Sequence, residues 1–157
     1  MRIYKLFWDD FSGWYLEIVK PAYGSPADRK TIDATRHYFD MLMRLIHPFM
    51  PFVTEEIWQD LTPRAKGESI MYAPAPAVEQ WDEALLTRFE FVKEAITDIR
   101  NVRKQKNIAQ KQPLTLKVIV DENYPASYAP VIVKMGNISA IETVTEKDPA
   151  AAAFIVK

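Results

Sequence analysis

The segment HPFMPFVTEEIWQ, residues 47–59, combines the residue types that metal sites and acid–base catalysts use. It places His47 before two adjacent carboxylates, Glu55 and Glu56, and imidazole and carboxylate groups can bind metal ions or transfer protons. Zinc-binding helices space their ligands one turn apart, as in H-E-x-x-H, whereas seven residues with two prolines separate His47 from Glu55. Only one other histidine, His37, occurs in the sequence. The spacing therefore argues against a metal site.

Other catalytic patterns are also missing from the sequence. The neighbouring carboxylates Asp9 and Asp10 would point about 100° apart on a helix, so they could not converge on one substrate atom. There is no cysteine, and the four glycines are spread too widely to form a phosphate-binding loop. We therefore expect no catalytic residue, no metal ligand and no bound cofactor in this chain.

The same segment has the features of a corner between two helices. Pro48 should end the first helix at His47, because a residue before proline avoids helical angles, and Pro51 suits the first position of the next helix. We expect the imidazole of His47 to face the unpaired carbonyls at the end of the first helix. Three apolar side chains are expected to fill the gap between the helices: Phe49, Met50 and Phe52.

The most distinctive charge feature is the run IRNVRKQKNIAQKQ, residues 99–112, which holds five cations and no acid: Arg100, Arg103, Lys104, Lys106 and Lys111. Helical spacing continues an apolar stripe that ends at Ile99 through Arg103 and Lys106. These cations either cover apolar surface with their stems and stay solvated, or contact an anion such as phosphate. The net charge of −1 gives no general reason to expect nucleic acid, so a nucleic-acid site would depend on this local run.

The positioning elements are mainly α-helical. Apolar residues three and four apart predict a helix over residues 3–20 with Trp8 and Trp14 in the core, and another helix from a cap at Ser25 to His47. A third helix, from Pro51 to about residue 61, should bury Trp58, and a fourth runs over about residues 83–106.

After Pro113 the pattern changes to alternation, which is typical of strands. We expect strands over 114–120, 138–144 and 152–156 and a short helix over 126–135. The predicted organisation is a helical bundle at residues 1–110, followed by a small β-α-β-β unit at residues 111–157.

Composition limits the class of protein. With 157 residues, 48% of them hydrophobic, the chain can form a packed core. The absence of cysteine fits a reducing compartment, and the charged N-terminal segment resembles neither a signal peptide nor a membrane span. We expect a cytoplasmic protein without a membrane partner, with a monomer favoured.

Four linked motifs carry a resemblance to a known family: FWDDFSGWYLEIVKP, RLIHPFMPFVTEEIWQ, ESIMYAPAP and ITDIRNVRKQKNI. In this order and spacing, over about residues 4–120, they resemble the C-terminal anticodon-binding domain of class I aminoacyl-tRNA synthetases, and WYLEIVKP with HPFMPF is most similar to the valyl enzymes. The isoleucyl and leucyl enzymes share this helical domain and remain alternatives.

The resemblance implies a module that binds the anticodon stem-loop of valine tRNA beside other domains of its parent chain. ATP-dependent attachment of valine would occur outside these residues, since the family's HIGH-like and KMSKS-like signatures are not found here. It also implies an earlier first helix of the bundle and a later coiled coil, neither of which we find within the sequence. The implied RNA-backbone contacts are Arg100, Arg103, Lys104 and Lys106, together with Arg36 and Arg44. A non-catalytic helical module that binds protein is the alternative of another class.

Overall fold

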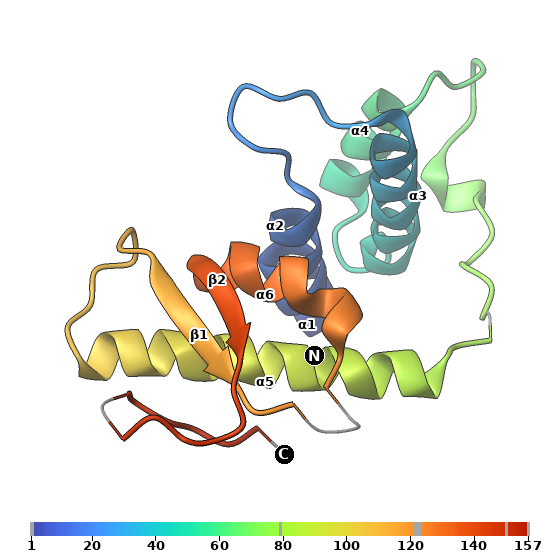
Figure 1. Cartoon of the computed structure of the whole chain (residues 1–157). Coiled ribbons are helices and arrows are strands. Elements are labelled where there is room, and N and C mark those ends of the chain that lie inside the picture. Colours follow the sequence, from blue (N-terminus) through green and yellow to red (C-terminus); the bar gives the residue numbers. More distant parts are fainter. Residues whose placement is uncertain (1, 79, 121–123, 150, 157) are drawn as a thin grey trace. The chain divides into compact units, whose positions relative to one another are not determined.

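The computed structural model describes residues 2–78, 80–120, 124–149 and 151–156. The chain forms two compact units, Met1–Glu79 and Gln80–Lys157, coloured blue to green and green to red in Figure 1. This division differs from the predicted boundary at residues 110 and 111, because the long helix α5 groups with the elements that follow it. Each unit is described separately below.

The first unit begins with a helical segment, as predicted. It runs through α1 (Arg2–Lys5), the π-helical η1 (Leu6–Tyr15) and α2 (Leu16–Val19), and stops before Pro21. In a π-helix the hydrogen bonds reach one residue further than in an α-helix, so each turn holds more residues. Side chains at α-helical spacing therefore do not all stay on one side of this segment.

The next two helices begin and end at local signals. Helix α3 (Arg29–Ile46) starts after Asp28, whose carboxylate accepts a hydrogen bond from the backbone N–H of Thr31 at 3.0 Å. Asp28 is therefore the N-cap, and the predicted cap at Ser25 was wrong. Helix α4 (Pro51–Leu61) opens with Pro51, as predicted, and η2 (Ile70–Tyr72) is a short 3-10 helix.

The core of the first unit contains Phe11, Leu42, Met43, Trp58 and Ile70. The prediction for Trp58 is confirmed, whereas Trp8 is 59% exposed and Trp14 is half-buried. The three residues expected to fill the corner are also exposed: Phe49 by 74%, Met50 by 53% and Phe52 by 90%. Phe49 and Met50 line an apolar groove, and Phe52 does not belong to its lining, so the prediction that the three residues fill the gap between the helices was wrong.

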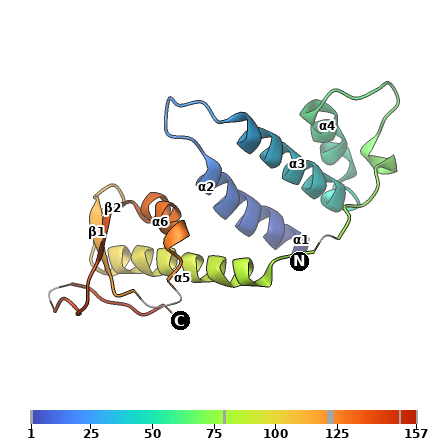
Figure 2. The same cartoon turned by 45° about the vertical axis from the view of Figure 1, so that its right-hand side comes forward.

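The second unit is built on α5 (Glu83–Gln105), which is capped by the carboxylate of Asp82. Strand β1 (Leu114–Val118) pairs in parallel with β2 (Ile138–Thr143), and η3 (Ala126–Tyr128) and α6 (Ala129–Gly136) lie between them in sequence. Figure 2 shows α6 and both strands beside the C-terminal half of α5.

Close packing explains why α5 belongs to this unit. A Cβ at Gly136, the last residue of α6, would lie 3.3 Å from Cδ1 of Ile99 on α5 and 3.2 Å from Cγ1 of Ile138 on β2. Helix α5 is therefore packed closely against α6 and belongs to the second unit.

The fold is mainly α-helical, as predicted, with a β-α-β arrangement in the second unit. Residues 152–156 have no regular structure, so the predicted third strand was wrong. Within the described ranges, no helix combines the length and the apolar character that a membrane crossing requires.

Candidate nucleic-acid interface

The corner at residues 47–54 is held by a histidine–threonine contact. The Nδ1 atom of His47 lies 2.8 Å from the hydroxyl of Thr54, and that hydroxyl donates to the carbonyl of Met50 at 2.8 Å. A threonine hydroxyl has one proton, so with this arrangement Nδ1 of His47 is the donor. His47 thus joins the end of α3 to the first turn of α4. The expectation that its ring caps the carbonyls of α3 is corrected.

Glu55 ties α4 to the segment that follows it. Its carboxylate accepts hydrogen bonds from the side chains of Gln59 (2.7 Å) and Ser69 (2.8 Å) and from the backbone N–H of Ile70 (3.0 Å). The bond from Gln59 is the main reason that the pKa of Glu55 lies below its usual 4.5, with the bonds from Ser69 and Ile70 and the nearby His47 adding to the effect. A carboxylate held ionised in this way is suited to structure and not to general acid catalysis, which needs a raised pKa.

Arg44, a predicted RNA contact, is used inside the first unit. It forms a 2.5 Å ion pair with Asp40, and its Nη1 donates to the carbonyl of Pro74 at 3.1 Å. Asp40 also accepts from Nε1 of Trp58 at 2.6 Å and from Arg64 at 3.2 Å. The side chain of Arg44 is only 18% exposed. Its guanidinium already has partners and little access to solvent, which argues against Arg44 as an RNA contact.

Arg103 is also buried. It is 1% exposed and is the largest fully buried side chain in the described part of the chain. Its four terminal N–H groups donate to main-chain carbonyls at 2.7–3.1 Å: Ala109, Gln112, Gly136 and Asn137. The stripe of α5 does continue through Arg103, but this residue faces the protein. This burial argues against the predicted contact of Arg103 with an RNA backbone.

The remaining predicted cations are exposed. Arg100, Lys104 and Lys106 lie at the C-terminal end of α5, and Arg36 lies on α3. Arg100 makes a 3.4 Å hydrogen bond to the carbonyl of Met135. Across the described residues, Arg36, Lys104 and Lys106 form no ion pair, so their charges are open to an external anion.

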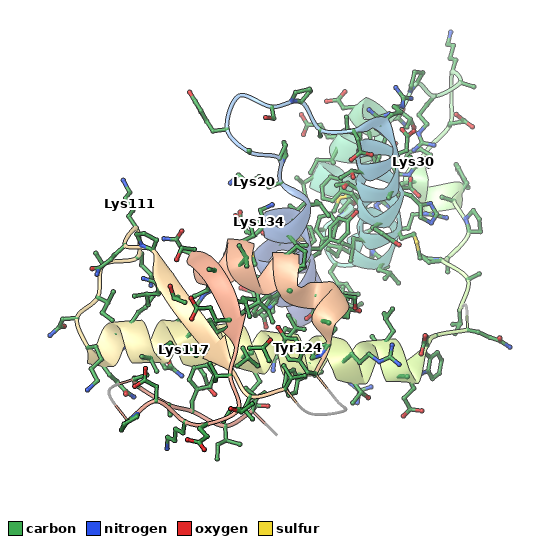
Figure 3. All side chains as sticks on the ribbon, viewed as in Figure 1. Lys20, Lys30, Lys111, Lys117, Tyr124 and Lys134 are labelled. Atoms are coloured by element: carbon green, nitrogen blue, oxygen red, sulfur yellow. The ribbon has the colours of Figure 1, made fainter. Side chains whose placement is uncertain are left out.

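Lys111 belongs to the basic run but was not among the predicted contacts. Figure 3 shows it on the turn before β1, with its side chain pointing away from the ribbon. It is exposed and lies on the loop that Arg103 binds. Lys117, by contrast, pairs with Asp148 at 2.7 Å. The hydrogen bond and the charge of Asp148 raise the pKa of Lys117. The lysine therefore stays protonated, and its positive charge is compensated by Asp148.

Comparison with known families identifies the domain. The family model described as the anticodon-binding domain of tRNA ligase matches residues 1–120. The chain belongs to this family. The matched residues run from α1 through the basic run and past the end of β1. They include every exposed cation of the candidate interface: Arg36, Arg100, Lys104, Lys106 and Lys111.

Curated relatives of this anticodon-binding domain are valine–tRNA ligases. The enzyme of Parabacteroides distasonis is 50% identical over 157 residues, and that of Phocaeicola vulgatus is 49% identical over 156 residues. The Thermotoga maritima enzyme is 35% identical over 158 residues. The alignments cover 99–100% of this chain but only 18% of each relative. The resemblance to the valyl enzymes is therefore confirmed.

Proposed function

We propose that this anticodon-binding domain binds the anticodon stem-loop of valine tRNA as part of a longer valine–tRNA ligase. The observation that carries the proposal is the family match over residues 1–120 together with relatives at 49–50% identity that are valine–tRNA ligases. The chain spans 18% of those relatives. Activation of valine with ATP and its transfer to the tRNA are proposed to take place in other domains of the parent enzyme, in the cytoplasm.

The proposed backbone contacts are the exposed cations. Lys104 and Lys106 are the primary pair, with Arg100, Lys111 and Arg36 as further contacts. Each cation that meets a phosphate releases a condensed counterion, so affinity should fall as salt rises. Arg44 and Arg103 are left out because their guanidinium groups are bound to carbonyl and carboxylate groups of the protein itself.

Recognition of an anticodon loop also requires contacts to unstacked bases, which stack on aromatic rings or guanidinium planes. The first unit exposes several rings that could serve: Tyr23, Phe49, Phe52 and Tyr72. Phe49 and Phe52 lie on the corner between α3 and α4, where an exposed aromatic pair has no packing role in the core. We propose these two rings as the first candidates for base stacking.

The salt dependence of binding tests the basic contacts. The 157-residue chain would be titrated with a valine tRNA transcript at 50 and 200 mM salt, as wild type and as K104Q/K106Q. Losing two phosphate contacts should reduce the slope of log K against log salt by about 1.5. The matched control is K5Q/K30Q, which removes the same charge from exposed positions on α1 and α3. Equal slopes for the two double variants would reject this surface.

A further inference from the structure

Arg103 is built into the protein in an unusual way for a cation. Two N–H groups of Nη1 donate to Ala109 (3.1 Å) and Gln112 (2.7 Å), and two of Nη2 donate to Gly136 (3.1 Å) and Asn137 (2.8 Å). All four acceptors are main-chain carbonyl oxygens. The first pair lies in the loop after α5, and the second pair lies at the C-terminal end of α6, where the helix dipole favours a cation. The side chain thus joins two separate segments.

The loop of residues 106–112 is held by further hydrogen bonds, among them one to the backbone of Arg103, one within the loop, and one from Asn137. The N–H of Ile108 donates to the carbonyl of Arg103 at 2.9 Å, and the N–H of Gln112 donates to Ala109 at 3.0 Å. The side-chain amide of Asn137 donates to the carbonyl of Gln110 at 2.7 Å. The loop is therefore fixed by its backbone, while the side chains of Lys106 and Lys111 stay exposed.

Lysine could not replace arginine in this position. Arginine holds its donors in a rigid planar fork, whereas lysine has three donors on a single nitrogen and cannot reach four carbonyls in two directions. Replacing Arg103 with Lys keeps the charge but leaves carbonyls of the loop and of α6 without their donor. The positive charge and the geometry of the donors can therefore be tested separately.

We propose that Arg103 is a positioning residue, which fixes the loop of residues 106–112 so that Lys106 and Lys111 meet the RNA backbone in one arrangement. This inference rests on the proposed function. A loop that is already ordered does not lose conformational freedom when it binds, so each lysine contributes more to affinity than it would on a mobile loop. Arg103 acts on RNA only through these lysines.

The first experiment compares R103K with wild type in binding to the valine tRNA transcript. R103K should bind about tenfold more weakly, because two phosphate contacts lose their fixed geometry. Amide hydrogen exchange should show faster exchange at Ile108 and Gln112 in R103K. The matched control is R88K, an exposed arginine on the same helix, which should change neither quantity. Unchanged exchange at both amides, or wild-type affinity in R103K, would overturn the proposal.

A double-mutant cycle separates positioning from general loss of stability. In a K106Q/K111Q background, R103K should lower affinity by less than about twofold, because the contacts that it positions are already gone. The full tenfold loss in that background would show that Arg103 does not act through the loop lysines.

The variant N137G tests the same loop if R103K does not fold. It removes the amide bond to Gln110, and glycine suits the left-handed backbone at this position (φ 51°). It should weaken binding about threefold, and wild-type affinity in N137G would count against the proposal.

The outcomes distinguish this inference from the proposed function. If wild type does not bind the valine transcript, the proposed function fails and the inference falls with it. If wild type binds and R103K binds equally well, the inference fails and the proposed function stands.

Discussion

Asp40 forms hydrogen bonds or ion pairs with three side chains in the first unit: Trp58, Arg64 and Arg44. Its replacement with asparagine tests how much these contacts stabilise the unit. Oδ1 accepts from Trp58 at 2.6 Å and from Arg64 at 3.2 Å, and Oδ2 pairs with Arg44 at 2.5 Å. Asparagine keeps an acceptor for Trp58 and Arg64. The amide nitrogen would then replace Oδ2 and place a donor against the donors of Arg44, so one ion pair is lost and another is weakened.

The magnitude follows from the burial of these groups. Side chains of Asp40, Arg44 and Arg64 are only 18–20% exposed. Exposed pairs contribute about 0.2–1 kcal/mol, whereas removing one partner of a fully buried pair costs about 3–5 kcal/mol. An intermediate site should lose about 1–1.5 kcal/mol at Arg44 and about 0.5–1 kcal/mol at Arg64. Asp40→Asn should therefore lower the free energy of unfolding of the first unit by about 2 kcal/mol.

Urea denaturation followed by far-ultraviolet circular dichroism measures this difference. The matched control is Asp33→Asn, which breaks the exposed pair with Arg29 on the same helix and should cost less than about 0.5 kcal/mol. The effect of Asp33→Asn should vanish in high salt, and most of the effect of Asp40→Asn should remain. A loss at Asp40 no larger than that at Asp33 would refute the argument.

Two further predictions concern single residues. The pKa of Glu55 in the folded chain lies below 4.5, so its carboxylate contributes stability above that pH and loses it as the pH falls through the lowered value. Glu55→Gln should thus be less stable than wild type at pH 7, and the difference should shrink below about pH 4.5 in urea melts; a constant difference down to pH 2 would contradict this. Ile96 is 0% exposed on α5, so Ile96→Ala should cost about 2–5 kcal/mol in the same assay. Leu86→Ala, at a position 50% exposed on that helix, should cost less than about 1 kcal/mol, and equal losses would contradict the assigned burial.

The helices were predictable because their ends depend on nearby residues. Pro51 and Asp82 begin helices through their own geometry and hydrogen bonds. Helix α3 ends at Ile46, close to Pro48, which has no N–H to continue the hydrogen bonds of the helix; His47 itself keeps helical angles (φ −47°, ψ −43°), so the expectation that the residue before proline leaves them was wrong. The N-cap of α3 was placed three residues early because Ser25 and Asp28 are both suitable caps in sequence. The structure uses the one whose carboxylate reaches the N–H of Thr31.

Burial was less predictable because it depends on distant residues. Trp8 fell on an apolar stripe at α-helical spacing, but this segment is π-helical, so the spacing no longer defines one face. The apolar stripe on α5 continues through Arg103, but we expected a solvated or anion-binding side chain there, and the structure buries it. Its role was missed because the four carbonyls that bind it come from two segments that no local pattern links to α5.

The central proposal is that this domain recognises the anticodon of valine tRNA. Comparing its affinity for two transcripts tests the proposal most directly. The 157-residue chain would be titrated with a valine tRNA transcript and with the same transcript carrying substituted anticodon bases, each at 50 and 200 mM salt. We predict tighter binding of the unaltered transcript at both salt concentrations, with affinity for both falling as salt rises. Equal affinity for the two transcripts, without salt dependence, would contradict the account.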